Sequence, residues 1–186
     1  MSAADSSFAL SWDVGNGKFP LKNKDAVIVA LSDSHDEALE INKESPLLMG
    51  FASNYRAYAL FHPDDKNLDK WKVAGTSLTR VYDAAATAAD ITIYYVSELM
   101  NAIRNNTMDQ AQLFDKGLRN AKIAVFRLET QVQEATEALM DLRDVHKGPD
   151  ADGIYGILLK LLNLSNIANE LRASFLRLID AAGIES

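Results

Sequence analysis

The sequence predicts a mainly α-helical protein: an elongated antiparallel bundle of three long helices and a shorter fourth, with a small N-terminal β element. Three observations predict this fold class. Apolar residues recur at alternating spacings of three and four over most of residues 76–183, and the breaks between these runs are only a few residues long. Near the N-terminus, one short segment alternates apolar and polar residues instead. The first pattern is typical of helices packed through heptads, short breaks favour antiparallel neighbours, and strict alternation indicates a half-buried strand.

The strand is expected at the start of the chain, where Phe8, Leu10, Trp12 and Val14 alternate with smaller or polar residues. The following Gly15-Asn16-Gly17 favours a tight turn. A strand at the edge of a sheet leaves backbone groups unpaired, and another chain can pair with them. These four apolar residues are therefore a candidate interaction edge.

The next segments predict shorter elements. Residues 26–31 form an apolar run that fits either a buried strand or a helix. A Ser-x-x-Glu capping box from Ser34 predicts the start of a short helix. Ser45 followed by proline predicts the N-terminus of the fourth helix, over residues 46–62. Residues 62–75 are polar and are expected to form a connecting loop.

The first two long helices are expected over residues 76–105 and 108–147, and the third is expected to follow a cap at Asp150 or Asp152 and to extend to Ala182. The residues predicted to form their buried stripes are Leu78, Tyr82, Ala85, Ala89, Thr92, Val96, Leu99 and Ile103; Leu118, Ala121, Val125, Leu128, Val132, Ala135, Leu139 and Leu142; and Ile154, Ile157, Leu161, Leu164, Ala168, Leu171, Phe175, Leu178 and Ala182. Residues 1–75 are expected to pack on a bundle of residues 76–186, giving one structural domain overall.

Composition narrows the function classes. The 186 residues carry a formal net charge of −7, which argues against a generic nucleic-acid binder because such proteins need a basic surface. The chain has no cysteine, so a disulfide framework, a cysteine-ligated zinc site and a thiol nucleophile are excluded. The start lacks the basic and apolar regions of a signal peptide. The cytoplasm is the default compartment, with export without a signal peptide as an open alternative.

The motifs that carry chemistry predict no catalytic, metal-binding or cofactor-binding site. A di-metal bundle site needs Glu-x-x-His, but Ser32, Ala59 and Arg143 stand three residues before the three histidines. The sequence contains no phosphate loop, nucleophile elbow or zinc-protease motif. We therefore expect a protein that is not an enzyme; an enzyme with residues scattered along the chain is the third hypothesis.

The leading hypothesis is a protein–protein interaction or assembly protein, whose partner is another protein or a second copy of the chain. The alternative is a membrane-active protein, such as a soluble toxin or pore component that rearranges and uses the apolar helix 76–105. Asp90 and Glu98 would keep this helix in solution until a trigger, and Tyr94 and Tyr95 would anchor it at a membrane interface. These two charges also argue against a resting transmembrane span.

Overall fold

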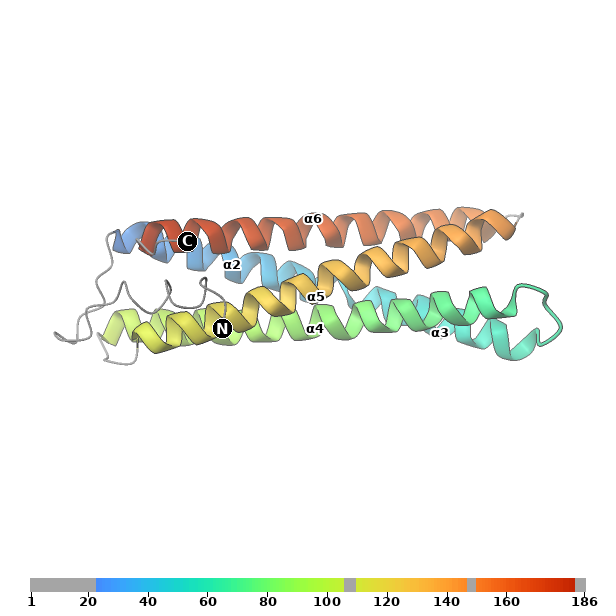
Figure 1. Cartoon of the computed structure of the whole chain (residues 1–186), viewed down its shortest axis with the longest axis horizontal. Helices are drawn as coiled ribbons and strands as arrows, with labels where there is room; N and C mark the ends of the chain where they lie inside the picture. Colours follow the sequence, from blue (N-terminus) through green and yellow to red (C-terminus); the bar gives the residue numbers. More distant parts are fainter. Residues whose placement is uncertain (1–22, 106–109, 147–149, 183–186) are drawn as a thin grey trace, which may run out of the picture. The chain divides into compact units, whose positions relative to one another are not determined.

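The computed structural model describes residues 23–105, 110–146 and 150–182 (Figure 1). Within these ranges all regular structure is helical. The helices are α2 (Lys24–Glu44), α3 (Pro46–Phe61), α4 (Leu68–Asn105), α5 (Gln110–Val145) and α6 (Asp150–Ala182). The predicted helical bundle is confirmed. The predicted β element, including the candidate interaction edge Phe8, Leu10, Trp12 and Val14, lies outside the described residues.

Helix α2 joins two segments that the sequence pattern left separate. Residues 26–31 are helical, so the helix alternative is correct for this run. The predicted helix start at Ser34 is wrong, because Ser34 lies mid-helix and its hydroxyl donates to the Ala30 carbonyl at 2.8 Å. A single stripe at 4-3-4-3 spacing is buried along the helix: Val27, Leu31, Ser34, Ala38 and Ile41. Burial of this continuous stripe outweighs the local capping signal.

Helix α3 begins at Pro46, as predicted, but without the predicted side-chain cap. Ser45 has helical backbone angles, φ −67° and ψ −34°, and its side chain makes no capping hydrogen bond. The chain passes from α2 almost without interruption, because the Ser45 N–H donates to the Ile41 carbonyl and the Leu48 N–H to the Ser45 carbonyl. The face that α3 buries consists of Leu48, Ala52, Tyr55 and Ala59.

Helix α4 begins at Leu68, eight residues before the predicted start at Thr76. The loop predicted over residues 62–75 is therefore wrong in its second half. Trp71 and Ala74 are buried and extend the stripe of Leu78 toward the N-terminus. The polar residues Lys72 and Thr76 lie on the exposed side and obscured the periodicity.

The buried stripes of the long helices are confirmed almost residue by residue. Every residue predicted to be buried in α5 and α6 is buried, and in α4 only Tyr82 is half-buried. The three-four spacing places these residues on one side of each helix, where they pack against neighbouring helices.

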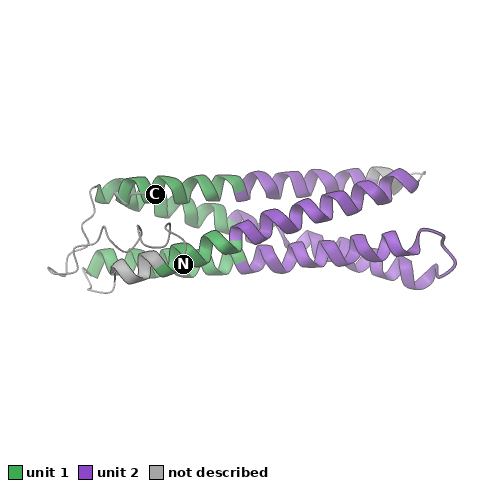
Figure 2. Cartoon of the chain, viewed as in Figure 1, with its two compact units in different colours: residues 1–39, 88–124, 169–186 green, residues 40–87, 125–168 purple. Residues whose placement is uncertain are grey.

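The chain divides into two compact units (Figure 2). Unit 1 contains residues 1–39, 88–124 and 169–186. Its core includes Val27, Leu31, Ala38, Ala88, Val96, Leu99, Leu118, Ala121, Leu171, Phe175 and Leu178. In this unit the Tyr95 ring occupies the space that a Cβ atom on Gly117 would fill. Glycine at position 117 therefore allows the aromatic ring to pack directly on the backbone of α5.

Unit 2 contains residues 40–87 and 125–168. Its core includes Ile41, Leu48, Ala52, Ala74, Leu78, Val81, Ala85, Leu128, Ala135, Leu139, Leu142, Ile154, Leu161 and Leu164. Helices α3 and α4 approach closely here, since a Cβ atom on Gly75 would lie 3.3 Å from the Ala52 carbonyl oxygen. All of α3 belongs to this unit.

Candidate interaction surface

A cluster of titratable and aromatic side chains lies in unit 2, around the turn between α3 and α4. The Asp65 carboxylate accepts hydrogen bonds from the Asn67 backbone N–H at 2.7 Å and from the Tyr58 hydroxyl at 3.0 Å. The Trp71 ring lies 4.3 Å from the Tyr58 ring and meets the His146 ring edge-on at 5.0 Å. The cluster therefore joins α3, α4 and the end of α5 through aromatic packing and one carboxylate.

This carboxylate is poorly suited to proton transfer. The Asn67 N–H has the largest effect and lowers the pKa of Asp65. Desolvation comes next and raises it, and the Tyr58 hydroxyl, the Trp71 indole and the charge of His146 each lower it by less, so that the pKa is lowered overall. The indole N–H contributes by proximity only, since no hydrogen bond of ordinary geometry joins it to Asp65. A carboxyl whose pKa lies below its usual range is a weak base at neutral pH, so the cluster is better explained as a structural junction.

The four residues predicted as membrane or switch residues do not share one surface of unit 1. Asp90 is exposed and Glu98 is half-buried. Tyr94 is 70% exposed, whereas Tyr95 is 2% exposed. Only Tyr94 is thus available as an aromatic anchor in this conformation. Among the described residues, no helix has the length and apolar character needed to cross a membrane.

Tyr95 and Thr92 are unusual among the buried residues of unit 1. Neither hydroxyl has a hydrogen-bond partner within the described residues. Burial raises the pKa of Tyr95 well above its ordinary value of 10.0, because the anionic form would have to be desolvated. Threonines elsewhere in the helices donate to the carbonyl four residues earlier, as Thr87 does to Asp83 and Thr136 to Val132.

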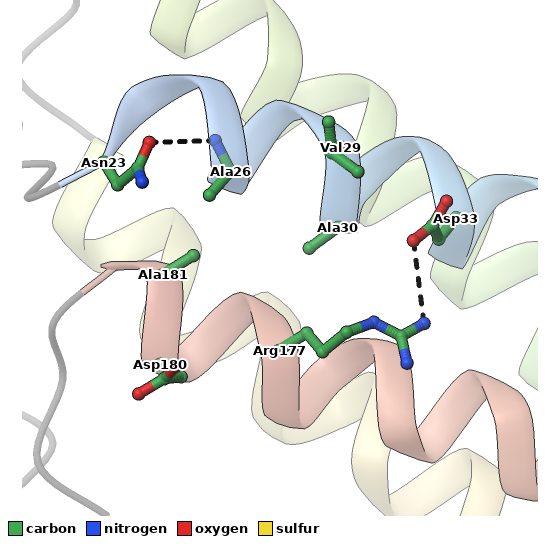
Figure 3. A pocket seen from close by; sticks show the side chains of 8 residues that line it. All are labelled: Asn23, Ala26, Val29, Ala30, Asp33, Arg177, Asp180 and Ala181. Carbon is green, nitrogen blue, oxygen red and sulfur yellow. Dashed lines mark hydrogen bonds and ion pairs between the residues drawn. The ribbon is translucent and has the colours of Figure 1, made fainter.

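Two surface grooves among the described residues are lined by both apolar and charged residues. The larger, about 730 Å³, lies in unit 1 between the start of α2 and the end of α6, and Figure 3 shows its lining. There Arg177 forms an ion pair of 3.6 Å with Asp33, so two of the charges facing the groove satisfy each other. The smaller, about 240 Å³, lies in unit 2 and includes Arg80, Asp83 and Arg127. Within the described residues, no group of three or more His, Asp or Glu side chains is arranged to hold a metal ion.

An exposed surface of unit 2 with large apolar side chains lies on α3, opposite its buried side. We call it the α3 outer face; it consists of Leu47, Gly50, Ser53, Asn54, Ala57, Leu60 and Phe61. Leu60 and Phe61 are each 75% exposed, the largest exposures among the large hydrophobic side chains, and Leu47 is 49% exposed. No member of the face is charged.

The α3 outer face was not predicted, although the sequence contains a signal for it. Leu47, Gly50, Asn54, Ala57 and Phe61 repeat at 3-4-3-4 spacing, which matches a helix stripe. A helix with apolar residues on both sides and one charge in 16 residues needs cover on more than one side.

Comparisons with protein-family models, with curated proteins and with solved structures find no match to this chain.

Proposed function

We propose that the chain is a non-enzymatic protein-interaction protein and that the α3 outer face binds a helix of its partner. The observation that carries the proposal is the exposure of Leu60 and Phe61 at the end of a four-turn helical face without charge. Large apolar side chains exposed side by side on an uncharged helical face are costly in water and are typical of binding sites.

The shape of the α3 outer face favours a helical partner. Small residues, Gly50, Ser53 and Ala57, run along its middle, and the larger Leu47, Leu60 and Phe61 lie near its ends. A Cβ atom added to Gly50 would meet nothing within 4 Å, so the middle of the face is open. Small side chains let a second helix axis come close, while large side chains at both ends supply buried area.

The charges around the face define the chemistry of the partner. Arg56 is the one charged residue of α3. Its guanidinium donates to the Thr79 hydroxyl at 2.6 Å and to the Ala52 carbonyl at 3.4 Å. Arg56 is exposed, but these two hydrogen bonds hold it beside the α3 outer face, whose own members carry no charge that could pair with a charged ligand. We therefore expect the partner to present an uncharged, apolar side of an amphipathic helix.

The test is a pair of matched surface variants. Leu60→Lys combined with Phe61→Lys places charge on the α3 outer face, and lysine near a helix C-terminus is compatible with the helix dipole. The control is Val73→Lys, which changes a residue of the same unit that is 54% exposed and lies off the face. Partners are recovered with the tagged parent chain from the cells that produce it, and their affinity is measured by calorimetry.

We expect the double variant to weaken binding by about 30-fold, on the order of 2 kcal/mol for two apolar side chains no longer buried. The Val73→Lys control is expected to bind like the parent. Equal binding by parent and double variant would contradict the proposal. Release of dye from lipid vesicles by the parent, at neutral or acid pH, would instead support the membrane-active alternative, which requires α4 to leave its buried position.

A further inference from the structure

A second uncharged stripe lies on α6, also within unit 2. We call it the α6 outer stripe; it consists of Tyr155, Leu159, Leu162 and Asn166, at 4-3-4 spacing. Tyr155 is 56%, Leu159 49% and Leu162 57% exposed, and Asn166 is also exposed. The opposite side of the same segment is buried and consists of Ile154, Ile157, Leu161, Leu164 and Ala168. This part of α6 therefore has two heptad-like stripes, of which the core of unit 2 uses one.

Charge is nearly absent from the part of α6 that carries the α6 outer stripe. Between Gly153 and Ala168 the one charged residue is Lys160, which lies off the stripe. Its Nζ is 3.6 Å from the Oε2 atom of Glu44, so its charge is paired within unit 2. A charged group of a partner that packed on this stripe would lose its hydration and would find no counter-ion there.

The order of residues along the stripe is self-complementary. When two copies of α6 lie antiparallel about a two-fold axis between Leu159 and Leu162, each Leu159 meets the Leu162 of the other copy. In the same register each Tyr155 meets the Asn166 of the other copy, which gives the tyrosine hydroxyl a polar neighbour. Gly156, next to the stripe, leaves room for these side chains because a Cβ atom there would meet nothing within 4 Å.

We propose that the α6 outer stripe is the seam of a homodimer, with the two α6 helices antiparallel. The occupant is a second copy because the stripe matches itself in residue spacing and polarity under a two-fold rotation, and because two chains of net charge −7 repel each other least where both are uncharged. The inference concerns a different surface from the α3 outer face and does not depend on it. A seam of three helical turns is smaller than a standard interface, so we expect a weak dimer, with a Kd between about 1 µM and 1 mM.

The experiment is sedimentation equilibrium of the full chain over this concentration range. The parent is expected to pass from the 20.5 kDa chain mass toward twice that value. Leu159→Glu is expected to remain at the single-chain mass, while Val73→Glu, a control of similar exposure in the same unit, dimerises like the parent. Circular dichroism checks that both variants keep the helix content of the parent.

Cysteine cross-linking tests the register, since the chain has no cysteine of its own. A mixture of Leu159→Cys and Leu162→Cys is expected to give more disulfide-linked heterodimer than either variant gives homodimer. A single-chain mass at all concentrations would overturn the inference, and so would a dimer that Leu159→Glu does not weaken. A dimer abolished by the paired Leu60→Lys and Phe61→Lys changes but not by Leu159→Glu would place the second copy on α3. That result would overturn the α6 seam while leaving an interaction role for the α3 outer face.

Discussion

The two halves of α6 share one buried pattern but have different outer surfaces. In unit 1, residues 169–182 carry four charges, at Glu170, Arg172, Arg177 and Asp180, and in unit 2, residues 153–168 carry one, at Lys160. Both halves bury residues at the same three-four spacing, including Leu164 and Leu171. The buried pattern thus explains the fold in both units, while the outer pattern distinguishes the unit that we expect to bind partners.

The interiors of the two units also differ. Unit 1 buries the Tyr95 hydroxyl without a partner within the described residues and packs its ring on Gly117. Unit 2 gives the Tyr58 hydroxyl a partner, the Asp65 carboxylate. A polar group buried without a partner costs free energy, whereas a bonded one contributes modestly. The contribution of Tyr95 to stability should therefore respond to changes in packing and desolvation, and that of Tyr58 to hydrogen bonding.

The largest change in the free energy of unfolding is expected for Gly117→Ala in unit 1. In an exposed helix interior, alanine is favoured over glycine by up to about 1 kcal/mol. At position 117 the new methyl group would overlap the Tyr95 ring, and overpacking of this kind costs about 1–3 kcal/mol. We expect urea unfolding to show a loss of that size for Gly117→Ala.

The control for this change is Gly156→Ala in unit 2, where the added methyl group has open space. This variant is expected to gain up to about 1 kcal/mol, because only helix propensity changes. Reducing the ring, as in Tyr95→Leu, should make Gly117→Ala less costly than it is in the parent. A Gly117→Ala protein as stable as the parent would show that the ring can move away freely.

The next effect concerns the buried hydroxyl of unit 1. Tyr95→Phe removes a polar atom that has no partner among the described residues, so the free energy of unfolding is expected to rise by about 1 kcal/mol. The raised pKa of Tyr95 adds a dependence on pH. The contribution of Tyr95 to the free energy of unfolding is constant while the pH is below about 10, the pKa of this tyrosine in the unfolded chain. It is lost as the pH rises above that value, because the unfolded chain then releases the Tyr95 proton while the folded chain keeps it.

Unfolding measured at pH 8 and pH 11 tests this linkage. The parent is expected to lose more stability than Tyr95→Phe between these pH values, and Tyr94→Phe, at an exposed position, should behave like the parent. Identical losses in the parent and in Tyr95→Phe would mean that Tyr95 ionises as easily in the folded chain as in the unfolded one.

How much of the fold could be predicted depended on the length of each pattern. The stripes of α5 and α6 run over many turns, and one register satisfies all of their apolar residues. The predicted starts at Ser34 and Thr76 relied on local capping signals and a polar stretch. Burial of Ile41 and Trp71 extended the helices through both positions, because packing of a long stripe outweighs a single capping hydrogen bond.

The interaction surfaces were harder to predict than the core. Asp90, Tyr94, Tyr95 and Glu98 stay a prediction for membrane or switch residues; of the two tyrosines, Tyr94 is exposed and Tyr95 is buried. Periodicity shows that a helix has an apolar side, and it does not show which side a neighbouring helix covers. The outer residues Leu60 and Leu159 became recognisable only when the opposite sides of α3 and α6 were found packed.

The smallest effect is expected for Tyr58→Phe in unit 2. The lowered pKa of Asp65 means that its contribution to stability is present above the unfolded value of about 3.8 and is lost as the pH falls through the folded value. Without the Tyr58 hydroxyl, the folded pKa should move up toward 3.8, but only in part, because the Asn67 N–H still donates to the carboxylate. Carbon-detected NMR titration of the Asp65 carboxyl measures this shift directly. Tyr155→Phe, at an exposed position of the same unit, should leave the pKa of Asp65 unchanged. An Asp65 pKa that is the same with and without the Tyr58 hydroxyl would show that the backbone donor alone sets it, and the difference between the tyrosines of the two units would then reduce to the burial of Tyr95.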